Sequence, residues 1–270
     1  MSLNPQSTTP PIVLVFAGND PTGGAGISAD IEAIASVGGH ASPVITAIAP
    51  QDTVSVKNYE CINHSLIIEQ ARVILEDMPV AAIKIGLLGS LTNIEIIHSL
   101  LIEHPTLPVV LDPVLASGAG NVLADNEMIN AIRDLLLPIT TVLTPNSIEA
   151  RQLAHHSDDL AACAQELLSL GTEFVLITGT HENTNEVINT LYSERRKLQE
   201  QTWPRLPHSY HGSGCTLASS IAGLLAQGME PFSAIHEAQR YTWETLKHGY
   251  RAGAGQHLPD RFYWTKKDKS

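Results

Sequence analysis

Short apolar runs recur along the chain and are separated by glycine-rich or polar segments. The runs that predict strands cover residues 12–16, 42–49, 81–85, 107–111, 141–143 and 174–177. Such continuous apolar runs are typical of strands that are covered on both faces. Weaker patterns predict one or two short strands within 54–62 and a surface hairpin of 186–192 and 196–203, with its turn at Ser193 and Glu194.

Apolar residues at helical spacing fill most of the segments between these runs. The predicted helices cover 27–37, 66–78, 91–102, 126–137, 160–170 and 232–247, and two more open at 144–150 and around Cys215. Strands that alternate with helices predict an α/β fold: a single-domain, doubly wound, mostly parallel sheet with helices on both faces. No composition shift divides the chain, so we expect one domain over 12–262, a flexible N-terminal tail over 1–11 and a charged C-terminal tail over 263–270.

Polar residues stand at or just past the ends of the predicted strands, namely Asp20, Gln51, Lys84, Asp112, Asn146 and Thr178. Each alone is compatible with an ordinary turn or helix cap. Together they predict one shared site, because ligands of open parallel sheets bind along the carboxyl edge of the strands.

A glycine-rich loop, Gly18 to Gly26, joins the first strand to the first helix. It suggests a phosphate-binding turn, but it lacks the lysine of the P-loop and the spacing of the dinucleotide-binding fingerprint. A purely structural role, in which the glycines let the helix approach the strand, remains open.

A second glycine turn, Gly212-Ser213-Gly214, leads into a small, apolar helix that begins with Cys215. Uncovered backbone N–H groups and the helix dipole make such a turn a candidate anion site. A thiol in the first helical turn is expected to have a lowered pKa and to serve as a base. The alternatives are that the glycines only shape the turn, that Cys215 only fills space, or that His211 is the base.

Composition limits the functions that fit. The 270 residues are 43% hydrophobic and 16% charged, a composition that is typical of a globular protein. The net charge of −12 argues against nucleic acid as a partner. No apolar run predicts a membrane span, and the first residues do not form a signal peptide. Three widely spaced cysteines, Cys61, Cys163 and Cys215, favour a reducing, cytoplasmic location.

Several of these motifs occur in one order that resembles a known family. The order is Gly18-Asn19-Asp20-Pro21-Thr22-Gly23-Gly24-Ala25-Gly26 with Asp30, then Gln51-Asp52-Thr53, Lys84-Ile85-Gly86, Asp112-Pro113-Val114, Thr144-Pro145-Asn146 with Glu149, and Gly212-Ser213-Gly214-Cys215-Thr216. It resembles the hydroxymethylpyrimidine/phosphomethylpyrimidine kinases of thiamine biosynthesis. The first and last motifs are specific to these kinases, and the others are shared with the wider ribokinase-like group, in which Asp usually replaces Cys215.

The resemblance implies a ribokinase-like fold, usually a homodimer, and ATP-dependent phosphorylation of 4-amino-5-hydroxymethyl-2-methylpyrimidine and then of its monophosphate. It implies that Gln51, Asp30, Gly18 and Leu87 bind the pyrimidine, and that Gly212, Ser213, Gly214 and Cys215 perform the transfer. It further implies that Asn146, Thr178 and Gly179 lie near ATP, and that Asp112 and Glu149 act on Mg²⁺ through water.

This chain also departs from the family pattern. The family often has a lysine soon after Asp-Pro-Val, where this chain reads Leu115-Ala116-Ser117-Gly118, and Lys-Gly-Gly-His, where this chain reads Thr178-Gly179-Thr180-His181. Two alternatives to the pyrimidine kinase therefore stand: a pyridoxal-type kinase on the same fold, and a non-catalytic protein that binds a pyrimidine phosphate.

Overall fold

A computed structural model describes residues 9–116, 120, 122–155 and 159–266. Its described strands form a nine-stranded sheet in the order β3-β2-β1-β4-β5-β6-β7-β8-β9. The strands are β1 Ile12–Asn19, β2 His40–Ile48, β3 Glu60–Cys61, β4 Val80–Ile85, β5 Val109–Leu111, β6 Val142–Leu143, β7 Phe174–Ile177, β8 Glu186–Ser193 and β9 Arg196–Pro204.

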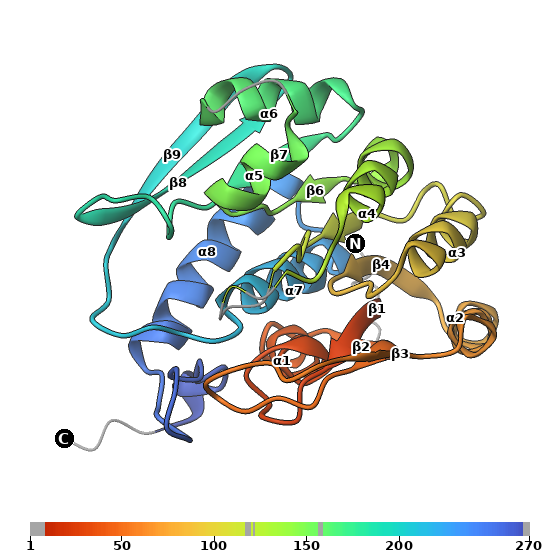
Figure 1. The fold of residues 1–270 in the computed structure, drawn as a ribbon, viewed down its shortest axis with the longest axis horizontal. Helices are drawn as coiled ribbons and strands as arrows, with labels where there is room; N and C mark the ends of the chain where they lie inside the picture. The colour runs from red at the N-terminus through yellow and green to blue at the C-terminus, as the bar shows by residue number, and fades with distance from the viewer. Residues whose placement is uncertain (1–8, 117–119, 121, 156–158, 267–270) are drawn as a thin grey trace, which may run out of the picture.

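The centre of the sheet is parallel and both edges are antiparallel. Strands β2, β1, β4, β5, β6 and β7 pair in parallel, so their carboxyl ends share one edge of the sheet. Strand β3 pairs antiparallel with β2, and β8 and β9 continue the sheet antiparallel beyond β7. Figure 1 shows this last pair as a long hairpin at the edge opposite β3.

Helices cover both faces of the sheet and enclose two hydrophobic cores. The helices are α1 Gly26–Ser36, α2 His64–Asp77, α3 Leu91–Leu101, α4 Asn126–Ala131, α5 Ser147–Leu153, α6 Leu160–Ser169, α7 Ser213–Ala226 and α8 Pro231–Lys247. One core contains buried residues of α2 to α6, and the other contains buried residues of α1, α7 and α8. The predicted α/β sheet with helices on both faces is confirmed.

Strand β1 shows why a continuous apolar run is needed at the centre. Leu14 and Phe16 pack into the core beneath α2 to α6, whereas Val13 and Val15 pack into the core beneath α7 and α8. Because successive side chains of a strand point to opposite faces, a strand between two cores must be apolar at every position.

Three details differ from the sequence-based expectation. The predicted surface hairpin is part of the main sheet, and its turn lies one residue later, at Glu194 and Arg195. The expected helix 126–137 is α4 followed by a π-helical turn, Ile132–Leu136, and a 3-10 turn, Leu137–Ile139. Pro138 lies in that last turn and cannot donate a helical hydrogen bond, so the α-helix does not continue.

The two expected tails fall partly outside the described residues. Residues 1–8 and 267–270 are not described, while Pro11 already accepts a hydrogen bond from the backbone of His40. The C-terminal segment from residue 263 begins with a 3-10 turn, Tyr263–Thr265. Within the described part of the chain, no helix is both long and apolar enough to cross a membrane.

Candidate active site

A cavity of about 410 Å³ lies at the carboxyl edge of the parallel strands. Its walls come from loops that follow β1, β2, β4, β5, β6 and β7 and from the N-terminus of α7. It brings together most of the residues that the sequence singled out, namely Gly18, Gln51, Leu87, Asp112, Asn146, Glu149, Thr178, Gly212, Ser213, Gly214 and Cys215.

The two glycine-rich turns lie against each other in the cavity wall. Gly212 has a φ of +84°, and a Cβ placed on it would lie 1.8 Å from the carbonyl oxygen of Gly24. Only glycine fits such a backbone approach. Arg261, which is fully buried, donates hydrogen bonds to the carbonyls of Gly23 and Gly24 and to the Thr216 hydroxyl, so one side chain ties the first turn to α7.

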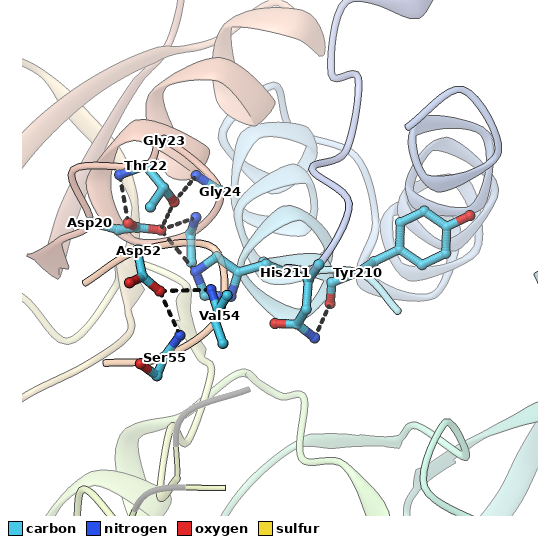
Figure 2. A network of polar contacts seen from close by, with 12 residues as sticks. Asp20, Thr22, Gly23, Gly24, Asp52, Val54, Ser55, Tyr210 and His211 are labelled. Carbon is cyan, nitrogen blue, oxygen red and sulfur yellow. Dashed lines mark hydrogen bonds and ion pairs between the residues drawn. The ribbon is translucent and has the colours of Figure 1, made fainter. Parts of the chain in front are cut away.

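A histidine and an aspartate also join these turns. His211 Nε2 lies 2.9 Å from Asp20 Oδ2, and Asp20 accepts hydrogen bonds from the N–H groups of Thr22 and Ala25 (Figure 2). Although burial raises the pKa of Asp20, the contacts with His211 and the two N–H groups lower it by more, so this carboxyl is ionised at neutral pH. Asp20 therefore orients His211 and shapes the first glycine turn.

The N-terminus of α7 has the geometry of an anion-binding turn. The first helical hydrogen bond of α7 runs from Thr216 N–H to the Gly212 carbonyl, and the N–H groups of Ser213, Gly214 and Cys215 precede it. N–H groups in the first turn of a helix have no partner within that helix. All three residues line the cavity, so the turn presents donors to an anion there.

The expected lowering of the Cys215 pKa is wrong. Burial raises the pKa of the thiol to about 12, and the neighbouring carboxylates Asp112 and Asp30 add to this shift. The positive charge of Lys84 and an N–H of Gly26 oppose it without offsetting it. A position near a helix N-terminus lowers a thiol pKa only where the loss of water around the sulfur does not dominate.

Asp112 and Glu149 are two of the carboxyl groups that line the cavity. Burial raises the pKa of Asp112 to about 6, against the lowering influence of Lys84. Burial, and then the nearby charge of Asp112, raises the pKa of Glu149 to about 8. Burial and mutual repulsion disfavour the ionised forms of these two carboxyl groups, and a bound cation would offset both effects.

Asn146 and Glu149 also form the N-terminal cap of α5. The Asn146 side chain accepts from the N–H groups of Ile148 and Glu149, and Glu149 Oε2 accepts from Asn146 N–H at 2.9 Å. This reciprocal capping holds both side chains at the end of β6. The sequence motif Thr144-Pro145-Asn146 with Glu149 therefore has a local structural role as well as a place in the cavity wall.

Two predicted site residues do not line the cavity. Asp30 is fully buried in α1, where it pairs with Lys84 at 2.8 Å and accepts a hydrogen bond from Ser219. It acts on the site through Lys84, which is among the cavity residues, and through its own charge, which contributes to the raised pKa of Asp112 and Cys215. Gly179 faces β8 instead: its N–H is bound to Asn189 Oδ1, and a Cβ on it would lie 2.2 Å from the Ile188 carbonyl oxygen.

Gln51 lies in a tight turn at one end of the cavity. Its backbone pairs with Val56, and the Asp52 side chain accepts from the N–H groups of Val54 and Ser55 (Figure 2). The neighbouring Thr53 carbonyl accepts from Gln256 N–H, which ties this turn to the C-terminal loop. Gln51 is thus held at the cavity by contacts on both sides of it.

The opposite end of the cavity contains residues without a role in the sequence-based prediction. They are Trp203 and Arg205 at the end of β9, Asn189 in β8, and Gln239, Thr242 and Trp243 in α8. Trp203 and Trp243 stack with ring centroids 5.9 Å apart. The hairpin pattern was visible in the sequence, but nothing local indicated that it continues the main sheet and so reaches the site.

Comparisons with known proteins agree with this geometry. The family model described as phosphomethylpyrimidine kinase matches residues 20–260. The hydroxymethylpyrimidine/phosphomethylpyrimidine kinase of Staphylococcus aureus (strain MSSA476) is 31% identical over 274 residues, which cover 96% of each chain.

Solved structures are similar over most of the chain. The phosphomethylpyrimidine kinase of Clostridium difficile 630 is 33% identical, with a TM-score of 0.74 over 86% of this chain and 97% of that one. The pyridoxal kinase of Staphylococcus aureus in complex with ADP is 25% identical, with a TM-score of 0.86 over 96% of each chain.

The sheet, the cavity at its carboxyl edge and the similarity to solved kinases define a kinase of the ribokinase-like class. Within that class, the family model covers nearly the whole described chain. The chain belongs to the phosphomethylpyrimidine kinase family.

Proposed function

We propose that this kinase transfers a phosphoryl group from ATP to 4-amino-5-hydroxymethyl-2-methylpyrimidine and then to the resulting monophosphate, as a step of thiamine biosynthesis. The observation that carries the proposal is one continuous cavity that joins Gln51 at one end, the α7 turn in the middle and Thr178 at the other end. Acceptor, transferred group and nucleotide would occupy these three parts.

Each part of the cavity suits the chemistry of its ligand. The Gln51 amide offers a donor and an acceptor to a ring nitrogen and its neighbouring amine, while Gly18 has no side chain and Leu87 offers an apolar side chain beside the flat ring. The N–H groups of Ser213, Gly214 and Cys215 would bind the phosphoryl group during transfer. Asn146 and Thr178 would lie beside the remaining phosphates.

Cys215 is the proposed acceptor of the hydroxymethyl proton. Its raised pKa means that the free protein holds a thiol and not a thiolate. The thiol is hydrogen-bonded to Asp112. Sulfur would therefore take the proton of the hydroxyl as its own proton passes along that bond to the carboxylate.

Mg²⁺ fits the donor set of the cavity. Asp112 and Glu149 offer hard oxygen ligands, and their raised pKa values show carboxyl groups that a cation would stabilise in the ionised form. Among the described residues no cluster of three or more His, Cys, Asp or Glu side chains is arranged to hold a metal by itself. Mg²⁺ would therefore bind through water and the nucleotide phosphates, and when bound it would neutralise their charge.

Two further properties belong to the proposal. We expect a homodimer, as the family resemblance implies, and a cytoplasmic location, as the cysteine usage suggests. Analytical ultracentrifugation of the purified protein tests the first.

The proposed activity is tested by measuring ADP release with hydroxymethylpyrimidine, with its monophosphate and with pyridoxal as separate acceptors. We expect turnover with both pyrimidines. A preference for pyridoxal would favour the second candidate, a pyridoxal-type kinase, to which the similarity with the Staphylococcus aureus pyridoxal kinase points. No turnover with any acceptor would favour the third candidate, a non-catalytic protein that binds a pyrimidine phosphate.

A further inference from the structure

The charges that line the cavity are poorly matched to a polyphosphate. Asp20, Asp112 and Glu149 contribute carboxyl groups to the walls. Histidines aside, the cationic side chains among the described lining residues are Lys84 and Arg205. Lys84 is fully buried and its Nζ lies 2.8 Å from Asp30 Oδ1, so its charge is already matched. Among the lining residues that the structure describes, Arg205 is therefore the positive charge that no ion pair neutralises.

Arg205 lies over the turn that follows β7, at the Thr178 end of the cavity. Its Nη1 donates to the Thr180 carbonyl at 2.9 Å, its Nε to the Thr184 carbonyl at 3.1 Å and its Nη2 to the Glu182 carbonyl at 3.1 Å. A guanidinium has five N–H donors in a fixed plane. Three of them fix the side chain on this turn, which leaves two for a ligand beside Thr180, another cavity residue.

We propose that Arg205 binds the phosphate groups of the nucleotide. Through the same guanidinium it also fixes the turn 180–184, which forms part of the nucleotide end of the cavity. A planar guanidinium is well suited to phosphate because it donates two parallel hydrogen bonds together with a positive charge. This inference rests on the proposed function, since it assumes that ATP occupies that end.

Arg151 provides a matched control. It holds the same turn from the side of α5, through an ion pair of its Nη1 with Glu182 Oε1 at 2.8 Å. Unlike Arg205, it is not among the residues that line the cavity. Replacing Arg151 loosens the turn and leaves the cavity charge in place, so it separates the two roles assigned to Arg205.

The test measures ADP and adenosine as competitive inhibitors against ATP in wild type, Arg205→Ala, Arg205→Lys and Arg151→Ala. In Arg205→Ala we expect ADP to bind about 10-fold more weakly or worse, because a charge-assisted contact with phosphate is lost. Adenosine, which has no phosphate, should lose less affinity than ADP, because it is affected only by the loosened turn. Arg205→Lys should recover part of the ADP affinity, and the KM for the pyrimidine should stay unchanged. Arg151→Ala should leave the ratio of ADP to adenosine affinity as in wild type.

Equal losses for ADP and adenosine in Arg205→Ala, or the same change of ratio in Arg151→Ala, would reduce Arg205 to a structural role and overturn the proposal. If Arg205→Ala does not fold, Arg205→Gln, which keeps a hydrogen-bond donor but removes the charge, decides the question: a larger loss of affinity for ADP than for adenosine supports phosphate binding, and equal changes for the two overturn it. Failure of the proposed function has a different signature in the wild-type protein: either turnover with pyridoxal in place of the pyrimidines, or neither ADP binding nor turnover with any acceptor.

Discussion

At the scale of single residues, Cys215 shows two physical effects that act on one thiol in opposite directions. A helix N-terminus and the ammonium group of Lys84 favour the thiolate, while burial and two carboxylates disfavour it. Burial dominates and raises the pKa to about 12. The residue can take part in proton transfer, but only together with a group that receives the thiol proton.

Replacing Cys215 tests this role. Cys215→Ser keeps the size of the side chain but replaces the thiol by a hydroxyl, which gives up its proton less readily, so we expect kcat to fall about 100-fold. Cys215→Asp should recover part of the rate, since related kinases carry Asp there. ADP affinity should change little in either variant, because the N–H groups of the turn remain. A near wild-type kcat in Cys215→Ser would show that Cys215 is not the base and would make His211, which Asp20 orients, the next candidate.

Glu149 offers a prediction on the dependence of stability on pH. Its pKa is raised from the ordinary value of 4.5 to about 8 in the folded protein, so between these values the folded protein holds a proton that the unfolded chain has lost. Stability should therefore fall as the pH rises through this range. Glu149→Gln removes this penalty and keeps an oxygen that can accept from Asn146 N–H.

We expect the melting temperature of Glu149→Gln, without nucleotide, to exceed that of wild type at pH 8 and to approach it at pH 5. Thermal denaturation at both pH values checks this. Glu127→Gln is the control, because Glu127 is an exposed residue in the first turn of α4. An equal effect at the two pH values would show that the carboxyl of Glu149 is not the titrating group. The variant should also need more Mg²⁺ for activity.

At the scale of elements, the β8–β9 hairpin has a turn that its residues do not favour. Glu194 and Arg195 have φ values of 48° and 58°, the left-handed region that suits Asn and Gly. The remaining interaction at the turn is an exposed ion pair of Glu194 with Arg196, which contributes little. The hairpin is therefore held mainly by its pairing with β7 and its packing on α8.

The double variant Glu194→Asn with Arg195→Gly should stabilise the protein by about 1 kcal/mol, because it removes strain from a two-residue turn. In a protein of this size that corresponds to a rise in melting temperature of about 2–4 °C. Glu194→Gln, which removes the charge without relieving the strain, should give no gain. A loss of stability in the double variant would mean that the local ion pair matters more than the backbone conformation.

At the scale of the whole molecule, the parts of the cavity are all arranged around one sheet. The walls extend from Ala17 in β1 to Gln256 near the C-terminus, and they include residues from both halves of the sheet. We therefore expect calorimetry to show one unfolding transition. ADP at about 100 times its Kd should shift that whole transition upward, by about 2.7 kcal/mol of added stability. Two separate transitions, of which ADP moves one, would argue against the single domain over 12–262.

The sequence by itself determined the architecture and the edge on which the site lies. Continuous apolar runs need cover on both faces, and helical periodicity between them provides it, so the parallel sheet follows from local patterns. The polar residues at the strand ends lie close together because parallel strands direct their carboxyl ends to one edge of the sheet. Gly212 and Gly24 are recognisable as turn residues from the sequence, although their close approach is not.

Only the tertiary structure decided what depends on burial and on distant partners. The pKa of Cys215 is set first by burial and then by charged side chains from β4, the end of β5 and α1, and no local sequence pattern reports how much water is excluded around the sulfur. The family resemblance implies that Asp30 binds the pyrimidine, yet Asp30 pairs with Lys84 inside the protein. Arg205 and Trp203 reach the cavity because the hairpin continues the main sheet beyond β7. The pairing of the hairpin with β7 depends on contacts between residues far apart in the sequence. The hairpin sequence alone is compatible both with a separate hairpin on the surface and with one that pairs with the main sheet.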